Sequence, residues 1–369
     1  MDNTIFQLLL DEVVNHGASD LHLSCKCKPV IRMHGELVAM ESYSITEESD
    51  LNSVISLVLN EKQSDVLKDK LSYDIGYSSD RGERYRINIY YERGSLALAI
   101  RWLNGEMQNF EELNLPAQLA ELSRLKDGLV LMTGATGSGK TTALASVLNQ
   151  INEYRPCHIL TIEDPIEFIH ENKMAVVHQR EVGVDVLSFA DAMRSALRED
   201  PDVVLVGEMR DLETMRAALM VAETGHLVFS TLHTNDAVGV IDRMIGAFPG
   251  AEQNNVRQQL SMVLRAVVTQ TLVKNFNEDG RVPINEILWV NHAVSHLIRE
   301  HKPEQIRSVM ETGKDYGNQT LEQAIAARVI NKEISMEQGL KLTTRAEQLK
   351  ELVNLEQKRP VYSRRGNRT

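Results

Sequence analysis

The pattern of hydrophobic and polar residues divides this chain into three stretches, and the first predicts a small α+β domain. Apolar residues at helical spacing predict helices at residues 5–14 and 47–59. Residues 19–24 alternate polar with apolar side chains, which is typical of a half-buried strand. Residues 30–38 predict a hairpin that turns near Gly35, and strands at 84–91 and 95–100 predict a second hairpin with its turn at 92–94. These elements predict an N-terminal domain over residues 1–103, followed by a polar linker over 104–112.

In the second stretch, over residues 113–290, predicted strands alternate with predicted helices. A short helix is expected at 117–123, short apolar runs occur at 129–132, 158–162, 203–206 and 227–230, and helix-length segments include 189–198 and 212–223. This alternation is typical of a parallel sheet that is covered by helices on both faces. Such sheets bind ligands at the carboxyl ends of their strands. The fold class predicted for the whole chain is α/β.

From about Val256 onward, the pattern predicts mainly helices, with one edge strand near residues 282–288. Helices are expected near 292–300, 302–311, 320–327 and 335–342, and we assign 291–345 to a C-terminal helical region. Residues 346–369 end in a basic stretch with few apolar side chains, which cannot bury enough surface to offset the entropy of ordering. We therefore predict a flexible tail over 346–369.

The charge balance and the cysteines exclude several classes of protein. The 40 Lys and Arg residues and 52 Asp and Glu residues give a net charge of −12, which argues against a nucleic-acid partner. The chain has no run of about 18 apolar residues, so we predict no transmembrane segment. Cys25, Cys27 and Cys157 cannot all form disulfides with one another, and a reducing cytoplasm is the expected location.

The strongest chemical motif is Gly-Ala-Thr-Gly-Ser-Gly-Lys-Thr at residues 134–141, which matches the phosphate-binding pattern G-x-x-x-x-G-K-[ST]. It lies between a predicted strand and a predicted helix, where glycines let backbone N–H groups approach a polyphosphate. Lys140 would bind the β- and γ-phosphates of ATP, and the Thr141 hydroxyl would bind Mg²⁺. The predicted nucleotide-binding residues are Gly134, Thr136, Gly137, Ser138, Gly139, Lys140, Thr141 and Thr142.

Two acidic segments, at 162–167 and 206–211, follow predicted strands of the same sheet. The second motif of P-loop ATPases has four apolar residues followed by Asp-Glu, and Gly207 occupies the Asp position here. This departure leaves Glu208 as the predicted base that activates water, and it shifts metal binding towards Thr141 and Glu163. The alternative for each acid is a helix cap or a salt bridge, for example to Arg210.

His226 and His233 flank the predicted strand at 227–230. A neutral imidazole can hydrogen-bond to phosphate or water, so we predict that His233 senses the γ-phosphate. The alternative for each histidine is a core or capping role.

These motifs, in this order, resemble the secretion ATPase superfamily, and within it the type IV pilus retraction ATPases (PilT-type). The resemblance runs from Gly17-Ala-Ser-Asp-Leu-His22 to about Gln323. It implies a cytoplasmic homohexamer with a PAS-like N-terminal domain and a RecA-like ATPase domain. In that family, ATP hydrolysis moves the domains against each other beneath an inner-membrane platform protein, and pilin is withdrawn from the pilus base.

The resemblance also assigns roles to individual residues. Lys140 and Thr141 bind nucleotide, Glu163 lies in the acidic box, Glu208 is the catalytic glutamate, and His226 with His233 forms the histidine box. Arg84, Arg86, Arg93 and Arg101 lie on one predicted hairpin, which resembles the family's Arg-Phe-Arg-Val-Asn segment, whose arginines approach the γ-phosphate as the domains close. Arg86 and Arg101 are the arginines that we predict to act in this way, and the alternative for them is a solvated basic edge of the sheet.

Two features bear on the branch of the family. A four-cysteine zinc site, usual in assembly ATPases, has no counterpart in this sequence, which favours retraction. Residues 293–300 keep only the second half of the retraction branch's Ala-Ile-Arg-Asn-Leu-Ile-Arg-Glu helix, which leaves an accessory paralogue (PilU-type) as an alternative to the main motor. A regulatory module that binds nucleotide without turnover is the other alternative, and the presence of Glu208 favours the motor.

Overall fold

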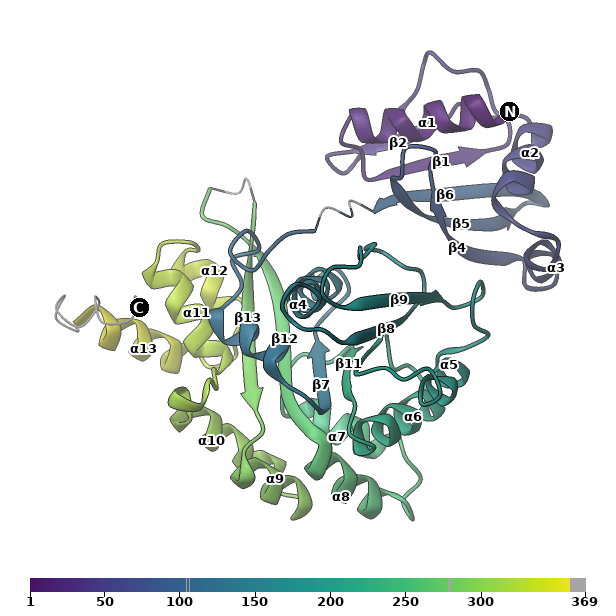
Figure 1. Cartoon of the computed structure of the whole chain (residues 1–369). Helices are drawn as coiled ribbons and strands as arrows, with labels where there is room; N and C mark the ends of the chain where they lie inside the picture. The colour runs from purple at the N-terminus through teal and green to yellow at the C-terminus, as the bar shows by residue number, and fades with distance from the viewer. Residues whose placement is uncertain (104, 106, 278–279, 359–369) are drawn as a thin grey trace. The chain divides into compact units, whose positions relative to one another are not determined.

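The protein is described by a computed structural model over residues 1–103, 105, 107–277 and 280–358. Contacts divide the chain into two compact units. The first comprises Met1–Glu106 with Ile162–Glu171 and Gln179–Ser188, and the second contains the remaining described residues. The α/β fold class predicted from the sequence is confirmed (Figure 1). Among the described residues, no helix is both long and apolar enough to cross a bilayer.

The first unit is built on a six-stranded antiparallel sheet in the order β3-β2-β1-β6-β5-β4. The strands are β1 (Asp20–Ser24), β2 (Val30–Met33), β3 (Glu36–Ala39), β4 (Ser72–Ser78), β5 (Arg84–Glu92) and β6 (Ser95–Leu103), and the helices are α1 (Asn3–Asn15), α2 (Glu48–Val58) and α3 (Glu61–Lys70). Along β5, Tyr85, Ile87 and Ile89 are buried, because successive side chains point to opposite faces. The Tyr85 hydroxyl donates a 3.0 Å hydrogen bond to the Leu10 carbonyl and so connects β5 to α1.

Two elements of this unit, α3 and β4, are absent from the sequence-based prediction. Helix α3 is almost entirely polar, and of its residues only Gln63 and Leu67 are buried, so its apolar periodicity is too weak to recognise. Strand β4 lies at the edge of the sheet and pairs only with β5 among the described strands, with one buried residue, Ile75. Both elements depend on packing against the rest of the unit more than on their own sequence pattern.

The second sheet has seven strands in the order β13-β12-β7-β11-β10-β8-β9 (Figure 1). The strands are β7 (Gly128–Thr133), β8 (His158–Glu163), β9 (Val176–Glu181), β10 (Val203–Val206), β11 (Leu227–Leu232), β12 (Leu264–Lys274) and β13 (Arg281–Trp289). Strands β10, β11, β7 and β12 run parallel, and β13 is antiparallel to β12. The carboxyl ends of four strands therefore meet at one edge of the sheet.

Helices cover both faces of this sheet, as the sequence predicts. On one face, Val130 and Met132 of β7 pack with Leu144 and Val147 of α4 (Lys140–Tyr154), together with the 3₁₀ helix η1 (Ala117–Arg124). The opposite face of β7 meets α6 (Leu212–Glu223) and α8 (Gln253–Val263). Helix α5 (Phe189–Ala196) lies between β9 and β10 in the chain, and α7 (Gly239–Gly246) follows β11.

The prediction of mainly helical structure beyond Val256 is wrong for residues 264–274, which form β12. This strand lies between β7 and β13, so most of its side chains are buried whichever face they point to. Its sequence therefore lacks the polar alternation that marks a half-exposed strand, and periodicity alone cannot distinguish it from a buried helix. Strand β9 and helix α7 are also missing from the prediction. The edge strand predicted near 282–288 is confirmed as β13.

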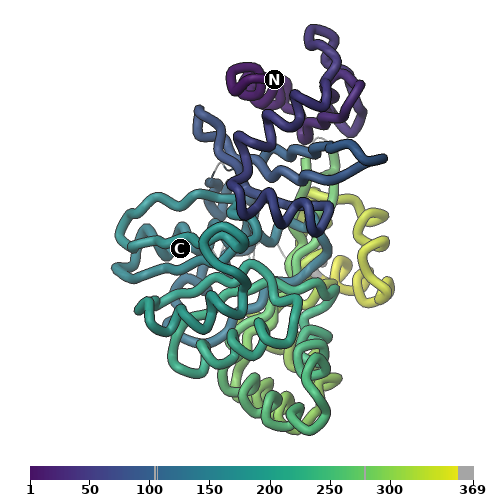
Figure 2. The backbone as a smooth tube through the Cα atoms, turned by 90° about the vertical axis from the view of Figure 1, so that its right-hand side faces the viewer, coloured from purple at the N-terminus to yellow at the C-terminus, as the bar shows by residue number. Residues whose placement is uncertain are grey.

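Helices follow β13, the outer strand of this sheet, and those closest to the C-terminus pack against it. They are α9 (His292–Arg299), η2 (Pro303–Gln305), α10 (Ile306–Thr312), η3 (Lys314–Tyr316), α11 (Leu321–Ile330), α12 (Met336–Leu340) and α13 (Ala346–Lys358). Both views place α11 and α12 beside β13 (Figures 1 and 2). Val282 and Ile284 of β13 share a buried cluster with Ile325 of α11 and with Leu349 and Val353 of α13.

Part of the predicted tail is therefore helical. The sequence assigns 346–369 to a flexible tail, but residues 346–358 form α13 and its Leu349 is fully buried. The basic composition of the last eleven residues hides the amphipathic pattern that precedes them. The rest of the predicted tail, residues 359–369, and residues 104 and 106 of the predicted linker lie outside the described residues.

Packing of α13 predicts a local stability effect. Leu349→Ala should lower the opening free energy of α11 and α13 by about 2–5 kcal/mol, the usual cost of a buried leucine truncation. Leu355→Ala, on the same helix but exposed, should change it by less than about 0.5 kcal/mol. Native-state hydrogen exchange of the full chain measures both effects. Equal protection in the two variants would show that α13 does not contribute to this core.

Candidate active site

The phosphate-binding motif forms the connection between β7 and α4. Gly134, Gly137 and Gly139 have φ values of 138°, 77° and 81°, which side-chain-bearing residues rarely adopt. Lys140, Thr141 and Thr142 form the first turn of α4, and Thr136 and Ser138 lie between the glycines. The backbone N–H groups at this helix start are unpaired within the helix and favour an anion. All predicted nucleotide-binding residues thus occupy one loop and one helix terminus.

Strand β12 supports this loop from the side. A Cβ atom on Gly134 would overlap the Gln270 carbonyl oxygen, and one on Gly139 would lie 2.8 Å from Gln270 Nε2. Gln270 Nε2 also donates a 2.8 Å hydrogen bond to the Ser138 carbonyl, and its Oε1 accepts one from Asn285 on β13. Sequence reasoning missed Gln270 and Asn285. The signal that was available is the polar Thr-Gln-Thr interruption of the apolar run at 269–271.

The Lys140 ammonium group lies over the loop, where it can meet a polyphosphate. Its Nζ donates hydrogen bonds of 2.9 Å to the carbonyls of both Gly134 and Ala135, and the residue is 8% exposed. These two hydrogen bonds hold the ammonium group beside the loop backbone that would surround a phosphate. This arrangement fits the predicted contact of Lys140 with phosphate.

The predicted base and the predicted phosphate sensor contact each other. Glu208 follows β10, His233 follows β11, and these two strands are parallel neighbours. His233 Nε2 lies 3.0 Å from Glu208 Oε1, and Arg210 Nε lies 2.8 Å from Glu208 Oε2. Both carboxylate oxygens of Glu208 therefore have partners, and the salt bridge to Arg210 that the sequence offers as an alternative role is present as well.

The ends of these two strands are tied together by side-chain hydrogen bonds. Ser230 donates to the Val206 carbonyl at 2.8 Å, and Thr231 donates to the Gly207 carbonyl at 2.6 Å. The Met209 N–H donates to the Thr231 carbonyl at 3.2 Å. The backbone on either side of Glu208 is therefore fixed relative to β11. A carboxylate held in this way, next to an imidazole, can orient and deprotonate a water molecule.

His226 does not join this pair. It precedes β11, and its carbonyl accepts from Gly128 at the start of β7, whereas His233 follows β11. Six strand residues at about 3.3 Å each separate the two histidines by about 20 Å. The His226 Nδ1 lies 3.1 Å from both the Thr224 hydroxyl and the Val221 carbonyl. The structure therefore does not bring His226 to the phosphate loop of its own chain.

Glu163 ends β8, the strand next to β10 in the sheet, and is assigned to the first unit. It is 6% exposed, and its Oε1 accepts a 3.2 Å hydrogen bond from Gln179 Nε2 on β9. The carboxylate at this position is thus oriented by a neighbouring strand.

The predicted arginines lie on paired strands of the first unit. Arg86 on β5 is directly opposite Arg101 on β6. Arg86 Nε lies 3.1 Å from Asp74, and Arg101 Nε lies 2.9 Å from Asp20. Burial raises the pKa of the Asp20 carboxyl, but the Ser19 hydroxyl and the Arg101 guanidinium outweigh it and hold that pKa below its usual value. Both arginines are therefore ion-paired on exposed strand surface, where such pairs contribute about 0–1 kcal/mol and exchange readily.

The predicted Mg²⁺ ligands have suitable chemistry. Thr141 offers a hydroxyl and Glu163 a carboxylate, and Mg²⁺ prefers oxygen ligands. Within the described part of the chain, no group of three or more His, Cys, Asp or Glu side chains could hold a metal ion by itself.

Comparison with known proteins places these features in a family. A model of the family described as Type II/IV secretion system protein matches residues 3–350. The chain is 44% identical over 303 residues to a twitching motility protein of Neisseria gonorrhoeae, covering 82% of this chain and 81% of that protein. It is 43% identical over 329 residues to the type IV pilus retractation ATPase PilT of Pseudomonas aeruginosa, covering 89% and 95% respectively.

A solved structure agrees with these sequence relationships. The pilus retraction motor PilT with bound ADP superimposes with a TM-score of 0.86 at 41% identity, covering 94% of this chain and 98% of that one. The resemblance to secretion ATPases that the motifs predict is confirmed, as is the expected order of an N-terminal domain followed by a RecA-like ATPase domain. Because the family model spans almost all of the described residues, the chain belongs to the Type II/IV secretion system protein family.

Proposed function

We propose that this chain is a motor ATPase that couples ATP hydrolysis to the retraction of type IV pili. The observation that carries the proposal is the Glu208–His233 pair, which lies at the same sheet edge as the phosphate loop. A loop that only binds nucleotide needs no oriented carboxylate, whereas hydrolysis needs a base that positions water. The relatives named for pilus retraction and twitching motility support the cellular role.

Each residue has a distinct role in this proposal. The phosphate loop and Lys140 bind and neutralise the phosphates, and Glu208 accepts a proton from the attacking water. His233 orients Glu208 and contacts the γ-phosphate or the water. Mg²⁺, when bound, would neutralise charge on the phosphate oxygens, with Thr141 and Glu163 as the residues that hold it.

The proposed function also includes an oligomeric assembly and its partners. We infer a homohexamer on the cytoplasmic side of the inner membrane, which binds the platform protein of the pilus machine and acts together with a paralogous retraction ATPase. Domain motion within such a ring would convert hydrolysis into work on the platform protein. The accessory role suggested by residues 293–300 is the second candidate function, because this segment departs from the family's helix motif.

Two substitutions separate nucleotide binding from turnover. Lys140→Ala should weaken ATP binding by at least about tenfold, because it removes a charge-assisted contact to phosphate that contributes about 1.5–3 kcal/mol. Glu208→Gln should leave binding within about threefold and lower turnover by about 10²–10⁴-fold, since a carboxamide cannot accept the proton. Glu213→Gln, an exposed acid on α6, is the control. Near wild-type hydrolysis by Glu208→Gln would show that another residue is the base, and Glu163 would be the first residue to test.

The arginines of the first unit should act on turnover and not on affinity. Arg86→Ala and Arg101→Ala should each lower hydrolysis by up to about 10³–10⁵-fold, the range of an arginine finger, with ATP affinity and oligomer size little changed. Arg93→Ala, at the tip of the same hairpin and almost fully exposed, is the matched control. If residues from 112 onward hydrolyse ATP as fast as the full chain, these arginines have no such role.

The cellular role is tested by imaging pili in a strain that lacks this chain. A main retraction motor predicts many long pili that fail to retract, because assembly then proceeds unopposed. Complementation with the wild-type chain should restore retraction, and complementation with Glu208→Gln should not. Near-normal retraction in the deletion strain would instead assign the chain to the accessory role.

A further inference from the structure

Strand β13 carries a buried carboxylate that none of the roles above uses. Glu286 lies in the middle of the strand and is 4% exposed. Its Oε2 accepts a 2.8 Å hydrogen bond from the backbone N–H of Ala237. Ala237 belongs to the connection between β11 and α7, residues 233–238, which begins with His233. Glu286 therefore binds the backbone of the segment that carries the predicted phosphate sensor.

Two further hydrogen bonds of this connection come from its own neighbourhood in sequence. Arg243 of α7 donates a 2.7 Å hydrogen bond to the His233 carbonyl. The Asp236 side chain accepts a 2.6 Å hydrogen bond from the Gly239 N–H at the start of α7. Glu286, in contrast, binds the connection from a different strand, and it does so through the backbone, whereas Glu208 contacts the His233 side chain.

The charges that face Glu286 connect it to the C-terminal helices. Burial raises the pKa of the Glu286 carboxyl above its usual value, the Ala237 N–H and the charge of the Arg307 guanidinium lower it, and Asp236 and Glu322 raise it further. Arg307 of α10 is thus a cation whose charge favours the ionised form of Glu286. A buried carboxylate needs such a partner and a hydrogen-bond donor to keep its charge.

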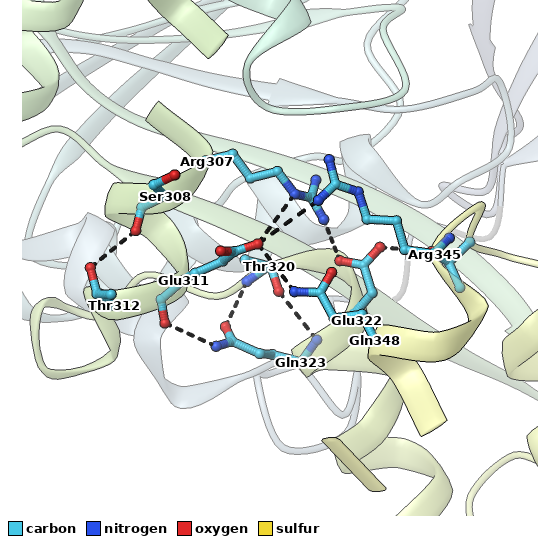
Figure 3. Close-up of polar contacts among 10 residues, drawn as sticks. Arg307, Ser308, Glu311, Thr312, Thr320, Glu322, Gln323, Arg345 and Gln348 are labelled. Carbon is cyan, nitrogen blue, oxygen red and sulfur yellow. Dashed lines mark hydrogen bonds and ion pairs between the residues drawn. The ribbon is translucent and has the colours of Figure 1, made fainter. Parts of the chain in front are cut away.

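Arg307 in turn belongs to a group of polar side chains that we call the C-terminal cluster. Figure 3 labels five of its members, Arg307, Glu311, Glu322, Arg345 and Gln348, and Thr343 is the sixth. Arg307 Nη2 lies 2.5 Å from Glu322 Oε2 on α11, and Thr343 donates to Glu322 Oε1 at 2.7 Å. The cluster joins α10, α11 and the start of α13 around one guanidinium.

A small cavity joins the same elements to the phosphate loop. It has a volume of about 160 Å³ and is lined by Gly134 and Ala135 of the loop, Asn235 of the connection, Glu286, and Leu321 of α11, among others. The phosphate loop, the connection after β11 and the C-terminal helices therefore border one space, with Glu286 between them. A shift of any one of them changes the surroundings of the other two.

We propose that Glu286 is a positioning residue for ATP hydrolysis, which holds the 233–238 connection so that His233 stays on Glu208. This inference rests on the proposed function, because it assumes that the Glu208–His233 pair acts in turnover. It adds that β13, against which α11 packs, helps to set the geometry of that pair through one buried hydrogen bond to the backbone of the connection.

The test uses steady-state hydrolysis by the full chain. Glu286→Ala should lower kcat at least about tenfold and change KM for ATP by less than about threefold, since it disturbs the reacting pair and not the phosphate loop. Glu286→Gln should retain at least a third of kcat, because its amide oxygen can still accept from Ala237. Ile284→Ala, a buried change two positions earlier on β13, controls for lost stability and should leave kcat within threefold.

A double variant gives a readout that lost stability would not produce. If Glu286 acts through His233, then adding Glu286→Ala to His233→Ala should cause little further loss of kcat, and the two single losses should not multiply. Unchanged kcat in Glu286→Ala, or losses that multiply in the double variant, would overturn the proposal. If Glu286→Ala does not fold, Glu286→Asp replaces it, because the shorter side chain keeps the charge beside Arg307 and withdraws from Ala237.

Failure of this inference can be distinguished from failure of the proposed function. If Glu208→Gln abolishes hydrolysis and Glu286→Ala does not, the motor assignment stands and the positioning role is wrong. If Glu208→Gln hydrolyses ATP normally, the reacting pair itself is wrong, and with it the premise of the positioning role.

Discussion

The close packing of β12 against the phosphate loop is the constraint on which the rest of the active site depends. Three glycines of the loop take left-handed φ values, and Gln270 fills the space where side chains on Gly134 and Gly139 would be. The same Gln270 bonds the Ser138 carbonyl and is itself held by Asn285. The loop therefore presents its N–H groups in a fixed arrangement, at low reorganisation cost when an anion binds.

The sheet also decides which acidic and basic groups can act together. Because β10 and β11 are parallel neighbours, residues that follow them emerge side by side, which brings Glu208 to His233. His226 precedes β11, so it lies at the opposite end of that strand from His233 and Glu208. Behind this pair, the buried Glu286 binds the backbone N–H of Ala237, and it lines the same small cavity as Leu321 of α11. Catalytic geometry and the packing of the helical region are thus parts of one structure.

The ion pairs of the first unit are more exposed than the contacts that hold the phosphate loop. Arg86 and Arg101 are bound to Asp74 and Asp20 on partly exposed strands, where exchange of partners costs little. Groups that must move during a mechanical cycle are better held by such weak pairs than by buried ones. These exchangeable pairs are compatible with the proposal that the two arginines change partners during turnover, whereas the phosphate loop is held by buried contacts.

The sequence by itself determined the phosphate loop, the two-part organisation and most of the half-buried elements, because these depend on local patterns of glycine and of alternating residues. Glu208 and His233 could also be selected, since each follows an apolar run. Only the tertiary structure decided that residues 264–274 form a central strand, that Gln270 and Asn285 support the loop, and that Glu286 reaches Ala237. A strand buried on both faces has lost the alternation that identifies it, and a contact between distant residues leaves no periodic signal in the chain.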